Sequence, residues 1–525
     1  MKKSHILIAA ALLVGTEGYC QGSRLLDSLT YKGEMQASLS TGDNTPLWLN
    51  ANRYGLSSLR NANGYLRGAL ERPLSVDEER RWGIGYGVDL AVPLHYTSNF
   101  VVHQAYGEVR WLHGTFTLGA KEQPLQLKNQ ELSSGSQTLG KNARPVPQAR
   151  LALPDYWRIP GLGGWLWLKG HLAYGIYTDG NWQNRFVGDN GHYSKNTLYH
   201  SKAGYVRIGN PEYHHVTFEA GIETACLFGG ELHNVMTNSG PMEKVNGETD
   251  LKAFWSALVF AGDDVGETDY ANVAGDQLGS WVARLNFDFD DWNFGIYYDH
   301  FFEDHSQVAF FDYDGYGEGK EYKVKKYNKY HLYKMKDMML GAELKLKQCD
   351  WINNIVFEYL YTKYQSSSVY HDHTENISDH VAGIDNYYNH YLYAGGWQHW
   401  GQVQGNPLYL SPIYQDGKLY VGNNRFVAFH LGIGGDNGYG NFKYRVLATW
   451  QKGWGTYEDP YVPKRKDVSL MAEAAYKLPD DFLSGGWSVK GALGFDHGEI
   501  YGDNFGVQLT ITKCGLVTPK NTKNR

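Results

Sequence analysis

The chain has 525 residues, 20% of them charged, and a formal net charge of −7 at pH 7. This balance argues against a dedicated nucleic-acid binder, which would carry a basic stripe, and the chain is not acidic enough to suggest disorder. It contains 62 glycines, 40 tyrosines and 16 tryptophans. Membrane-spanning barrels use glycine where strands crowd or bend, and tyrosine and tryptophan at both membrane interfaces. The composition therefore favours a membrane barrel over a soluble domain.

The N-terminus is typical of a secretory signal peptide over residues 1–20. Lys2 and Lys3 precede an apolar run at residues 6–15, and a cleavage point follows at Cys20. Ten apolar residues are too few to span a membrane as a helix. A buried N-terminal helix and a lipidated Cys20 are the alternatives. After this segment, no stretch of 18 apolar residues occurs, so we expect residues 21–525 to form a single domain that enters a membrane with strands.

Alternating segments begin at residues 31–39, where the odd-numbered residues are apolar or small and the even-numbered residues are polar. A candidate strand follows at residues 65–72. Residues 81–92, RWGIGYGVDLAV, give the clearest signal, because every second residue from Trp82 to Val92 is apolar and the others are small or acidic. Strand side chains point alternately to opposite faces, so one face is apolar. Since ~9–11 residues of a tilted strand cross a bilayer, this segment predicts a transmembrane strand.

Two further strands at residues 103–112 and 115–121 are joined by a tight turn, and then the alternation stops. Residues 123–164 carry five prolines with serine and glycine clusters, which is unfavourable for a ladder strand. We expect this segment to fold inside or against the barrel. Alternation resumes at residues 165–177, 203–208 and 215–228. A second irregular segment at residues 229–276 contains LKAFWSALVFAG, whose spacing suits a short helix or turn.

The remaining strands alternate clearly, apart from a third irregular segment at residues 362–424. The candidate strands number about seventeen, and single-chain bacterial barrels use even numbers of strands. We therefore predict an all-β, transmembrane antiparallel barrel of about 18 strands. A barrel of 16 strands is the second choice. Inserted loops and short helices are expected to occlude its lumen. A soluble β-sandwich is the alternative. The predicted strands are residues 281–289, 292–298, 338–346, 355–361, 426–434, 442–450, 468–477, 487–496 and 504–512.

The irregular segments carry a resemblance to a known family. TPLWLNANRYG (45–55), GAKEQPLQL (119–127), LSSGSQTLGKNARPVPQARL (132–151), GIDNYYN (383–389) and GGWQHWGQVQGNPL (395–408) together resemble the capsule assembly Wzi family of outer-membrane proteins. The resemblance implies an occluded, monomeric 18-stranded barrel that binds capsular polysaccharide at the cell surface and helps assemble or attach the capsule. It implies no catalytic residues. We also expect no cofactor. The tyrosine-rich loops at residues 311–333 and 387–393 depart from the family pattern.

The third irregular segment is the densest source of groups that suit a glycan. Aromatic faces pack against sugar C–H groups, and amide or carboxylate groups bridge hydroxyls. The alternative is that these aromatics belong to a girdle or pack the loop on itself. The candidate polysaccharide-binding residues are Asp385, Asn386, Tyr387, Tyr388, Trp397, His399 and Trp400.

Charged and amide residues in the recognised segments suit a different role. We predict that they pin the inserted chain to the lumen wall by charge-assisted hydrogen bonds rather than contact a ligand. These residues are Asn52, Arg53, Lys121, Glu122, Asn142 and Arg144.

The sequence favours binding over catalysis. The stretch HDHTEN at residues 371–376 has no established zinc spacing, and we expect no metal site and no enzyme activity. The expected partners are surface polysaccharide and outer-membrane lipid, with no nucleic acid. A porin for small solutes is the first alternative function. A hydrolase that uses luminal carboxylates such as Glu219 or Glu223 is the second.

Overall fold

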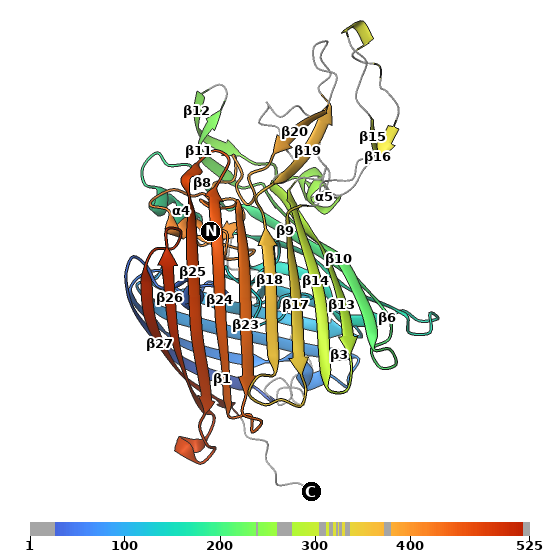
Figure 1. The fold of residues 1–525 in the computed structure, drawn as a ribbon, viewed down its shortest axis with the longest axis vertical. Coiled ribbons are helices and arrows are strands. Elements are labelled where there is room, and N and C mark those ends of the chain that lie inside the picture. The colour runs from blue at the N-terminus through green and yellow to red at the C-terminus, as the bar shows by residue number, and fades with distance from the viewer. Residues whose placement is uncertain are drawn as a thin grey trace, which may run out of the picture.

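A computed structural model describes residues 27–237, 240–259, 276–303, 311–313, 319–321, 324, 328–330, 336–371 and 380–517. The chain forms a closed antiparallel barrel of 18 strands (Figure 1), which confirms the predicted fold class and strand number. The predicted signal peptide at residues 1–20 lies outside the described residues.

Each barrel strand pairs with the next one along the chain, and β1 pairs with β27 from Thr30 opposite Leu516 to Thr41 opposite Phe505, which closes the ring. The strands are β1 (Thr30–Thr41), β2 (Ala62–Arg72), β3 (Trp82–Leu94), β4 (Val101–Trp111), β5 (Gly114–Ala120), β6 (Gln148–Arg158), β7 (Leu166–Ile176), β9 (Leu198–Ile208), β10 (Val216–Phe228), β13 (Asp276–Asp288), β14 (Trp292–Glu303), β17 (Met338–Leu346), β18 (Asn354–Tyr361), β23 (Phe426–Asp436), β24 (Phe442–Gly455), β25 (Pro460–Lys477), β26 (Trp487–Gly498) and β27 (Asn504–Leu516).

Side chains of β3 alternate between the two faces of the barrel wall. Trp82 and Val92 are 60% and 58% exposed on the outer face, whereas Asp89 and Ala91 are buried on the inner face. The same pattern runs around the ring and leaves an apolar outer band, as a barrel in a bilayer requires. Among the described residues, no helix is long and apolar enough to cross a membrane.

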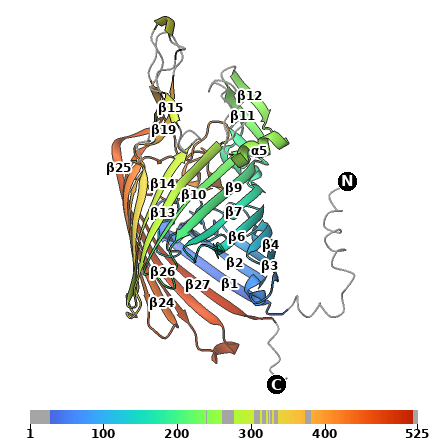
Figure 2. The same ribbon diagram turned by 90° about the vertical axis from the view of Figure 1, so that its right-hand side faces the viewer.

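The two ends of the barrel differ in the length of their connections. At one end, which we call the short-turn end, β4 joins β5 through residues 112–113 and β13 joins β14 through residues 289–291. At the opposite end, which we call the long-loop end, connections include residues 42–61, 121–147 and 362–425. Figure 2 shows the long connections gathered at this end. In bacterial outer-membrane barrels the long loops are extracellular and the short turns periplasmic.

The first irregular insertion is shorter than the predicted 123–164. Irregular chain ends at Pro147, because residues 148–158 form β6, which pairs with β5 and β7. Pro154 is accommodated where the register between β6 and β7 shifts, between Leu153 and Trp157. Proline has no N–H to give to a ladder, and such a bulge does not need one.

The second irregular segment was predicted at residues 229–276, and its described parts, residues 229–237 and 240–259, lie at the long-loop end rather than in the lumen. It includes β11 (Glu231–Thr237) and β12 (Gly240–Asn246), which form a sheet with β8 (Tyr193–Lys195). It also contains α5 (Leu251–Val259), which confirms the predicted short helix. Ala253 and Ala257 of α5 pack with Cys226 and Phe228 of β10. This segment therefore covers part of the rim.

Short elements complete the fold. They are α3 (Leu47–Asn50), η1 (Leu74–Asp77), α4 (Gly180–Val187), β15 (Phe311–Tyr313), η3 (Gly319–Glu321), β16 (Asn328–Tyr330), β19 (Ser366–His371), β20 (His380–Ile384), β21 (Gln398–His399), β22 (Gln402–Val403), η4 (Pro412–Tyr414) and η5 (Phe482–Ser484).

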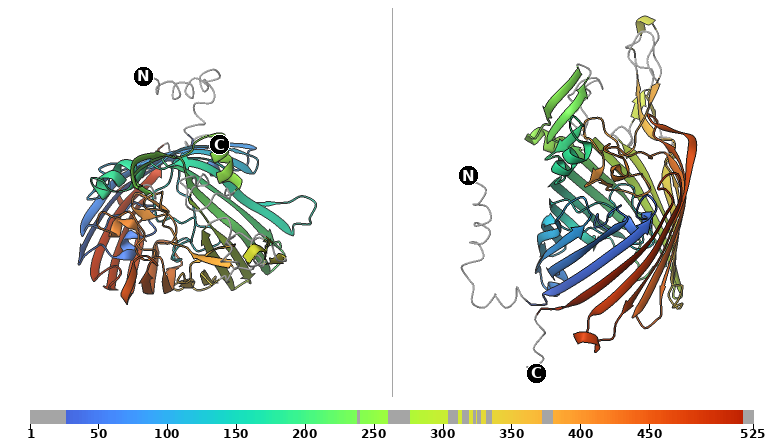
Figure 3. Two further views of the ribbon diagram at one scale, coloured as in Figure 1. Left: turned by 90° about the horizontal axis from the view of Figure 1, so that it is seen from above. Right: turned by 90° about the vertical axis from the view of Figure 1, so that its left-hand side faces the viewer.

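Three long-loop connections turn back into the barrel. We call them together the plug, with a first arm at residues 43–61, a second arm at residues 121–147 and a third arm at residues 385–425. Viewed from above, their ribbons lie inside the ring of strands (Figure 3). Among the described residues, the largest buried hydrophobic cluster joins side chains of all three arms to inward-facing side chains of the wall.

Candidate functional site

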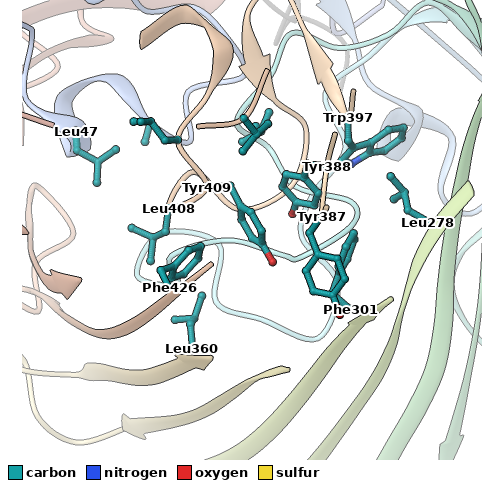
Figure 4. Packing of buried hydrophobic residues seen from close by; sticks show 14 of the residues in the cluster. Leu47, Leu278, Phe301, Leu360, Tyr387, Tyr388, Trp397, Leu408, Tyr409 and Phe426 are labelled. Carbon is teal, nitrogen blue, oxygen red and sulfur yellow. The ribbon is translucent and has the colours of Figure 1, made fainter. Parts of the chain in front are cut away.

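The centre of the plug is a group of buried aromatic side chains (Figure 4). Tyr387, Tyr388 and Tyr409 come from the third arm, and Phe301 and Phe426 come from the wall strands β14 and β23. The Tyr388 and Tyr409 rings stack with centroids 4.0 Å apart, and the Phe301 ring meets Tyr387 edge-on at 4.8 Å. Such pairs add to the stability that area burial provides. The third arm is therefore packed to the wall as a protein core is packed.

Wall carboxylates hold the serine-rich stretch of the second arm. Glu358 of β18 accepts hydrogen bonds from the Ser133 hydroxyl at 2.5 Å and from the Ser134 amide at 2.9 Å. Asp299 of β14 accepts a hydrogen bond from Lys128 Nζ at 2.7 Å and another from the backbone N–H of Gln137 at 3.0 Å. Hydrogen bonds to a charged acceptor are the stronger kind, so this stretch is firmly docked.

Lys128 is the buried cation in these contacts between the second arm and the wall. Burial alone lowers the pKa of the Lys128 ammonium, but the neighbouring carboxylates of Asp299 and Glu223 raise it above its ordinary value. The side chain is therefore charged at neutral pH. A charged lysine in this position requires its carboxylate partner, because an isolated buried charge is costly.

The three arms also bind one another around the stretch SSGSQ at residues 133–137. Asn52 of the first arm donates from Nδ2 to the Ser134 carbonyl at 2.8 Å. Asn406 of the third arm donates from Nδ2 to the Ser134 hydroxyl at 3.1 Å. Trp397 donates from its indole nitrogen to the Thr138 carbonyl at 2.9 Å. These contacts make the plug one connected body.

The six predicted pinning residues all contact the wall, a barrel loop or another arm of the plug. Their role as pins stays a prediction. Their partners are Asn142 for Asn52 at 3.0 Å, Glu473 for Arg53 at 3.4 Å, Glu108 for Lys121 at 2.7 Å, His103 for Glu122 at 2.6 Å, Val403 for Asn142 at 3.1 Å, and Thr97 and Ser98 for Arg144 at 2.8 and 3.0 Å.

The predicted polysaccharide-binding residues do not form one open surface. Tyr387, Tyr388 and Trp397 are fully buried, and His399 is 1% exposed, so a sugar cannot stack on these rings in this conformation. Asp385 and Asn386 are half-buried, and Asn386 accepts a hydrogen bond from Asn424 at 2.6 Å. Residue composition suggested a glycan surface here, but it could not distinguish a packed aromatic core from an exposed one.

Trp400 is the most accessible of the predicted glycan aromatics. Its indole nitrogen donates to the Thr178 hydroxyl at 3.1 Å, and the Arg144 guanidinium lies 4.3 Å from the ring centroid. Burial lowers the pKa of Arg144 to about 10, so this guanidinium is charged at neutral pH. A cation on one face of an indole is a stable arrangement.

A cavity of about 80 Å³ separates the plug from the wall at β6, β7 and β9. Its lining contains the side chains of Gln148, Arg150 and His171 and no carboxylate. Within the described residues, Arg150 forms no ion pair or hydrogen bond through its side chain, and Gln148 Oε1 has no partner. The cavity is therefore cationic. Sequence reasoning missed Arg150, because residues 123–164 were predicted to be irregular and the position of Arg150 on β6 was not foreseen.

The full lining of this cavity combines aromatic, amide and basic groups from plug and wall. It consists of Tyr54, Lys121, Gln123, Pro124, Gln126, Thr138, Leu139, Gly140, Ala143, Arg144, Pro145, Val146, Gln148, Arg150, His171, Tyr199, Ser201, Trp397 and Gln404.

A second cavity of about 190 Å³ lies against β1 to β4. Its arginine is paired with two of its carboxylates: Arg67 Nη2 lies 2.5 Å from Asp89 Oδ2 and 3.4 Å from Glu122 Oε1. The luminal carboxylates of the hydrolase alternative are also engaged, since Glu219 accepts from Arg207 at 2.7 Å and Glu223 accepts from Tyr205 at 2.8 Å. These groups serve as wall contacts in the structure.

Comparisons with known proteins agree with the barrel architecture. No protein-family model matches the chain, and no curated protein matches its sequence. Among solved structures, it is similar to Wzi of Escherichia coli, described as a carbohydrate-binding β-barrel involved in group 1 capsule assembly, with a TM-score of 0.53 and 14% identity over 97% of this chain and 86% of that one.

Two outer-membrane proteins of Pseudomonas aeruginosa are also similar. OccK5 (OpdH) matches with a TM-score of 0.44 and 8% identity over 93% of this chain and 98% of that chain. OprD matches with a TM-score of 0.42 and 9% identity over 94% of this chain and 97% of that chain. The strand topology and the similarity to Wzi together show that the chain has the fold of an outer-membrane β-barrel.

Proposed function

We propose that this protein resides in the outer membrane as a monomer, with its long-loop end at the cell surface, and that it binds surface polysaccharide and helps assemble or attach a capsule. The observation that carries the proposal is the plug. All three arms enter from the long-loop end, and the buried wall carboxylates of Glu358 and Asp299 hold the second arm in place. A lumen filled in this way suits a surface anchor better than a channel.

Two further observations support the proposal. The fold is similar to that of Wzi, which is described as carbohydrate-binding. The cationic cavity at Arg150 offers a free guanidinium beside amide and aromatic groups. Guanidinium groups bind carboxylates through two parallel hydrogen bonds, so the cavity suits a glycan that carries carboxylate groups. We infer that the bound polysaccharide is acidic.

Capsule retention in a deletion strain tests the proposal directly. Cell-bound and released polysaccharide are measured in the deletion strain, and in the same strain complemented with the wild-type gene. We expect the polymer to be made in equal amount but shed into the medium without the protein. Complementation with the wild-type gene restores binding. A capsule that stays on the cells of the deletion strain would overturn the proposal.

Planar-bilayer recording distinguishes the proposed capsule-binding function from the porin alternative. Purified wild-type protein is expected to give no steady conductance, because the plug fills the lumen with packed side chains. A stable open channel, together with reduced uptake of small solutes in the deletion strain, would favour the porin. Product formation from isolated capsule, abolished by Glu219→Gln or Glu223→Gln, would instead favour the hydrolase.

A further inference from the structure

The outer face of β18, β23, β24 and β25 carries an ordered set of aromatic and basic side chains near the long-loop end. These four strands are neighbours in the wall (Figure 1). One row across them is aromatic: Tyr359 lies opposite Phe429, and Phe429 lies opposite Trp450. The Phe429 ring is 5.2 Å from that of Tyr359 and 5.9 Å from that of Trp450. This row is the kind of aromatic belt found at a membrane interface.

The next rows toward the long-loop end are cationic. Lys452 of β24 lies directly opposite Lys466 of β25, one position beyond the row of Trp450 and Val468 on the same face. Like charges in this cross-strand position destabilise a sheet unless an anion lies between them. The row beyond contains Arg425, whose Nε donates to the Lys363 carbonyl at 3.2 Å.

Three lysines converge on one indole in these rows. The ammonium groups of Lys363, Lys452 and Lys464 lie 5.0, 5.4 and 5.6 Å from the ring centroid of Trp454. Within the part of the chain that the structure describes, none of the three forms an ion pair with a carboxylate. The nearby carboxylate of Asp459 accepts a hydrogen bond from Tyr420 at 3.1 Å instead. Among the described residues, the lysines are thus held together without a carboxylate to neutralise them.

The same end of the barrel is apolar on its other side. At the long-loop ends of β1, β3 and β4, the outward residues Leu39, Leu94 and Val102 are 62%, 60% and 52% exposed. The cationic rows are therefore a local feature of one face, and the general need for polar groups at a membrane boundary does not account for them. We call the group Lys363, Arg425, Lys452, Lys464 and Lys466 the basic rows.

We propose that the basic rows bind the phosphorylated headgroup of an outer-leaflet lipid. Ammonium and guanidinium groups bind phosphate oxygens strongly, and clustered basic side chains beside a membrane recognise anionic lipids. A lipid occupant also explains why the basic rows lie directly beyond the aromatic row. Its acyl chains can lie along Phe429 and Trp450 while its phosphates reach Lys452 and Lys466. A soluble polyanion would use the basic rows alone.

The test measures binding of diphosphoryl lipid A to the purified, detergent-solubilised full-length protein by native mass spectrometry. The test variant is Lys452→Gln/Lys464→Gln. The matched control is Lys443→Gln/Lys477→Gln, which removes two exposed lysines from the short-turn ends of the same two strands. We expect the test variant to bind at least about fivefold more weakly than wild type and the control variant to bind like wild type. Lys452→Arg/Lys464→Arg should retain binding.

Three comparisons make the result decisive. Monophosphoryl lipid A should bind the wild type more weakly than the diphosphoryl form does. Binding of phosphatidylcholine should be the same for the wild type and the variants. Soluble polygalacturonate tests the rival occupant: if it binds the wild type as tightly as lipid A does and needs the same lysines, the lipid assignment is overturned. Equal lipid A binding by wild type and the test variant, or no binding to wild type, overturns it as well. Heat-modifiability on gels checks that each variant is folded.

Discussion

Lys128 Nζ lies 2.7 Å from Asp299 Oδ2, and both side chains are essentially inaccessible to solvent. The two residues are 171 positions apart, one in the plug and one in the wall. A buried ion pair of this kind contributes little relative to a well-packed apolar pair, but removing one partner leaves a buried charge. This pair therefore makes the closed state of the plug sensitive to a single substitution.

Asp299→Ala should loosen the plug. Removing one partner of a buried pair costs about 3–5 kcal/mol, so we expect brief conductance events in planar bilayers and faster proteolysis within residues 121–147. Asp288→Ala is the control, because Asp288 pairs with Lys347 at the same 2.7 Å but both side chains are more than 40% exposed. Exposed pairs contribute about 0–1 kcal/mol, so the control should remain closed. If Asp299→Ala showed neither conductance events nor faster proteolysis, the Lys128–Asp299 pair would not be what holds the second arm in place.

Gly405→Ala should disturb the contact between the second and third arms. A Cβ at this position would lie 1.9 Å from the Tyr388 hydroxyl and 2.3 Å from the Gln137 carbonyl oxygen. Overpacking of this kind costs about 1–3 kcal/mol, so hydrogen exchange in residues 385–425 should accelerate. Gly491→Ala is a matched control, since nothing lies within 4 Å of its added Cβ. Equal exchange in both variants would contradict the packing described for the plug.

Acidification should loosen the third arm through His390. Burial, with His192 nearby, lowers the pKa of His390 from 6.5 to about 4. The unfolded arm therefore binds the proton more tightly than the folded arm, and the stability of the fold is lost as pH falls from 6.5 toward 4. Nδ1 of His390 also faces the amides of Leu392 and Tyr393 at 3.1 and 3.3 Å, which requires an unprotonated nitrogen.

The measurement is hydrogen exchange of residues 385–425 at about pH 7.5 and about pH 4.5, corrected for the intrinsic rate. Wild type should lose protection at the lower pH. His390→Gln should show a smaller difference between the two conditions. If both proteins respond equally to pH, another group controls the arm.

Arg150→Gln should weaken binding of an acidic glycan. A hydrogen bond to a charged group contributes about 1.5–3 kcal/mol, so we expect about tenfold weaker binding of polygalacturonate, or more. Arg158→Gln is the control, because Arg158 lies exposed at the opposite end of the same strand. The affinities are compared by isothermal titration calorimetry. Equal affinity of the two variants would exclude the Arg150 cavity as the carboxylate site.

The barrel could be predicted because its pattern is local. Each strand shows its two faces in about ten residues, as in Arg81 to Val92, and an even strand number is required when the ring closes with antiparallel pairs throughout. The error at residues 148–158 has an equally local cause. Five prolines suggested that no strand could form there, yet Pro154 is placed in a bulge, and bulges depend on pairing between strands that the sequence does not reveal.

The candidate site was less predictable, because burial is decided by contacts between distant segments. Tyr388 and Trp400 lie in one loop and looked equivalent in the sequence. Tyr388 is fully buried by Tyr409 and Phe301, whereas Trp400 remains accessible. The free guanidinium of Arg150 depends on the absence of a carboxylate across the cavity, which also requires three-dimensional information.

The pairing of β1 with β27 has a consequence for the order of the strands. The Val517 amide donates to the Leu29 carbonyl at 2.8 Å, so the two ends of the barrel domain meet side by side at the short-turn end. The ring then has no structural first strand. A short linker could join residue 517 to residue 29, and new ends could be opened in the turn at residues 437–441. Such a circular permutant keeps every strand pair and every plug contact, and differs only in the order in which the strands are made.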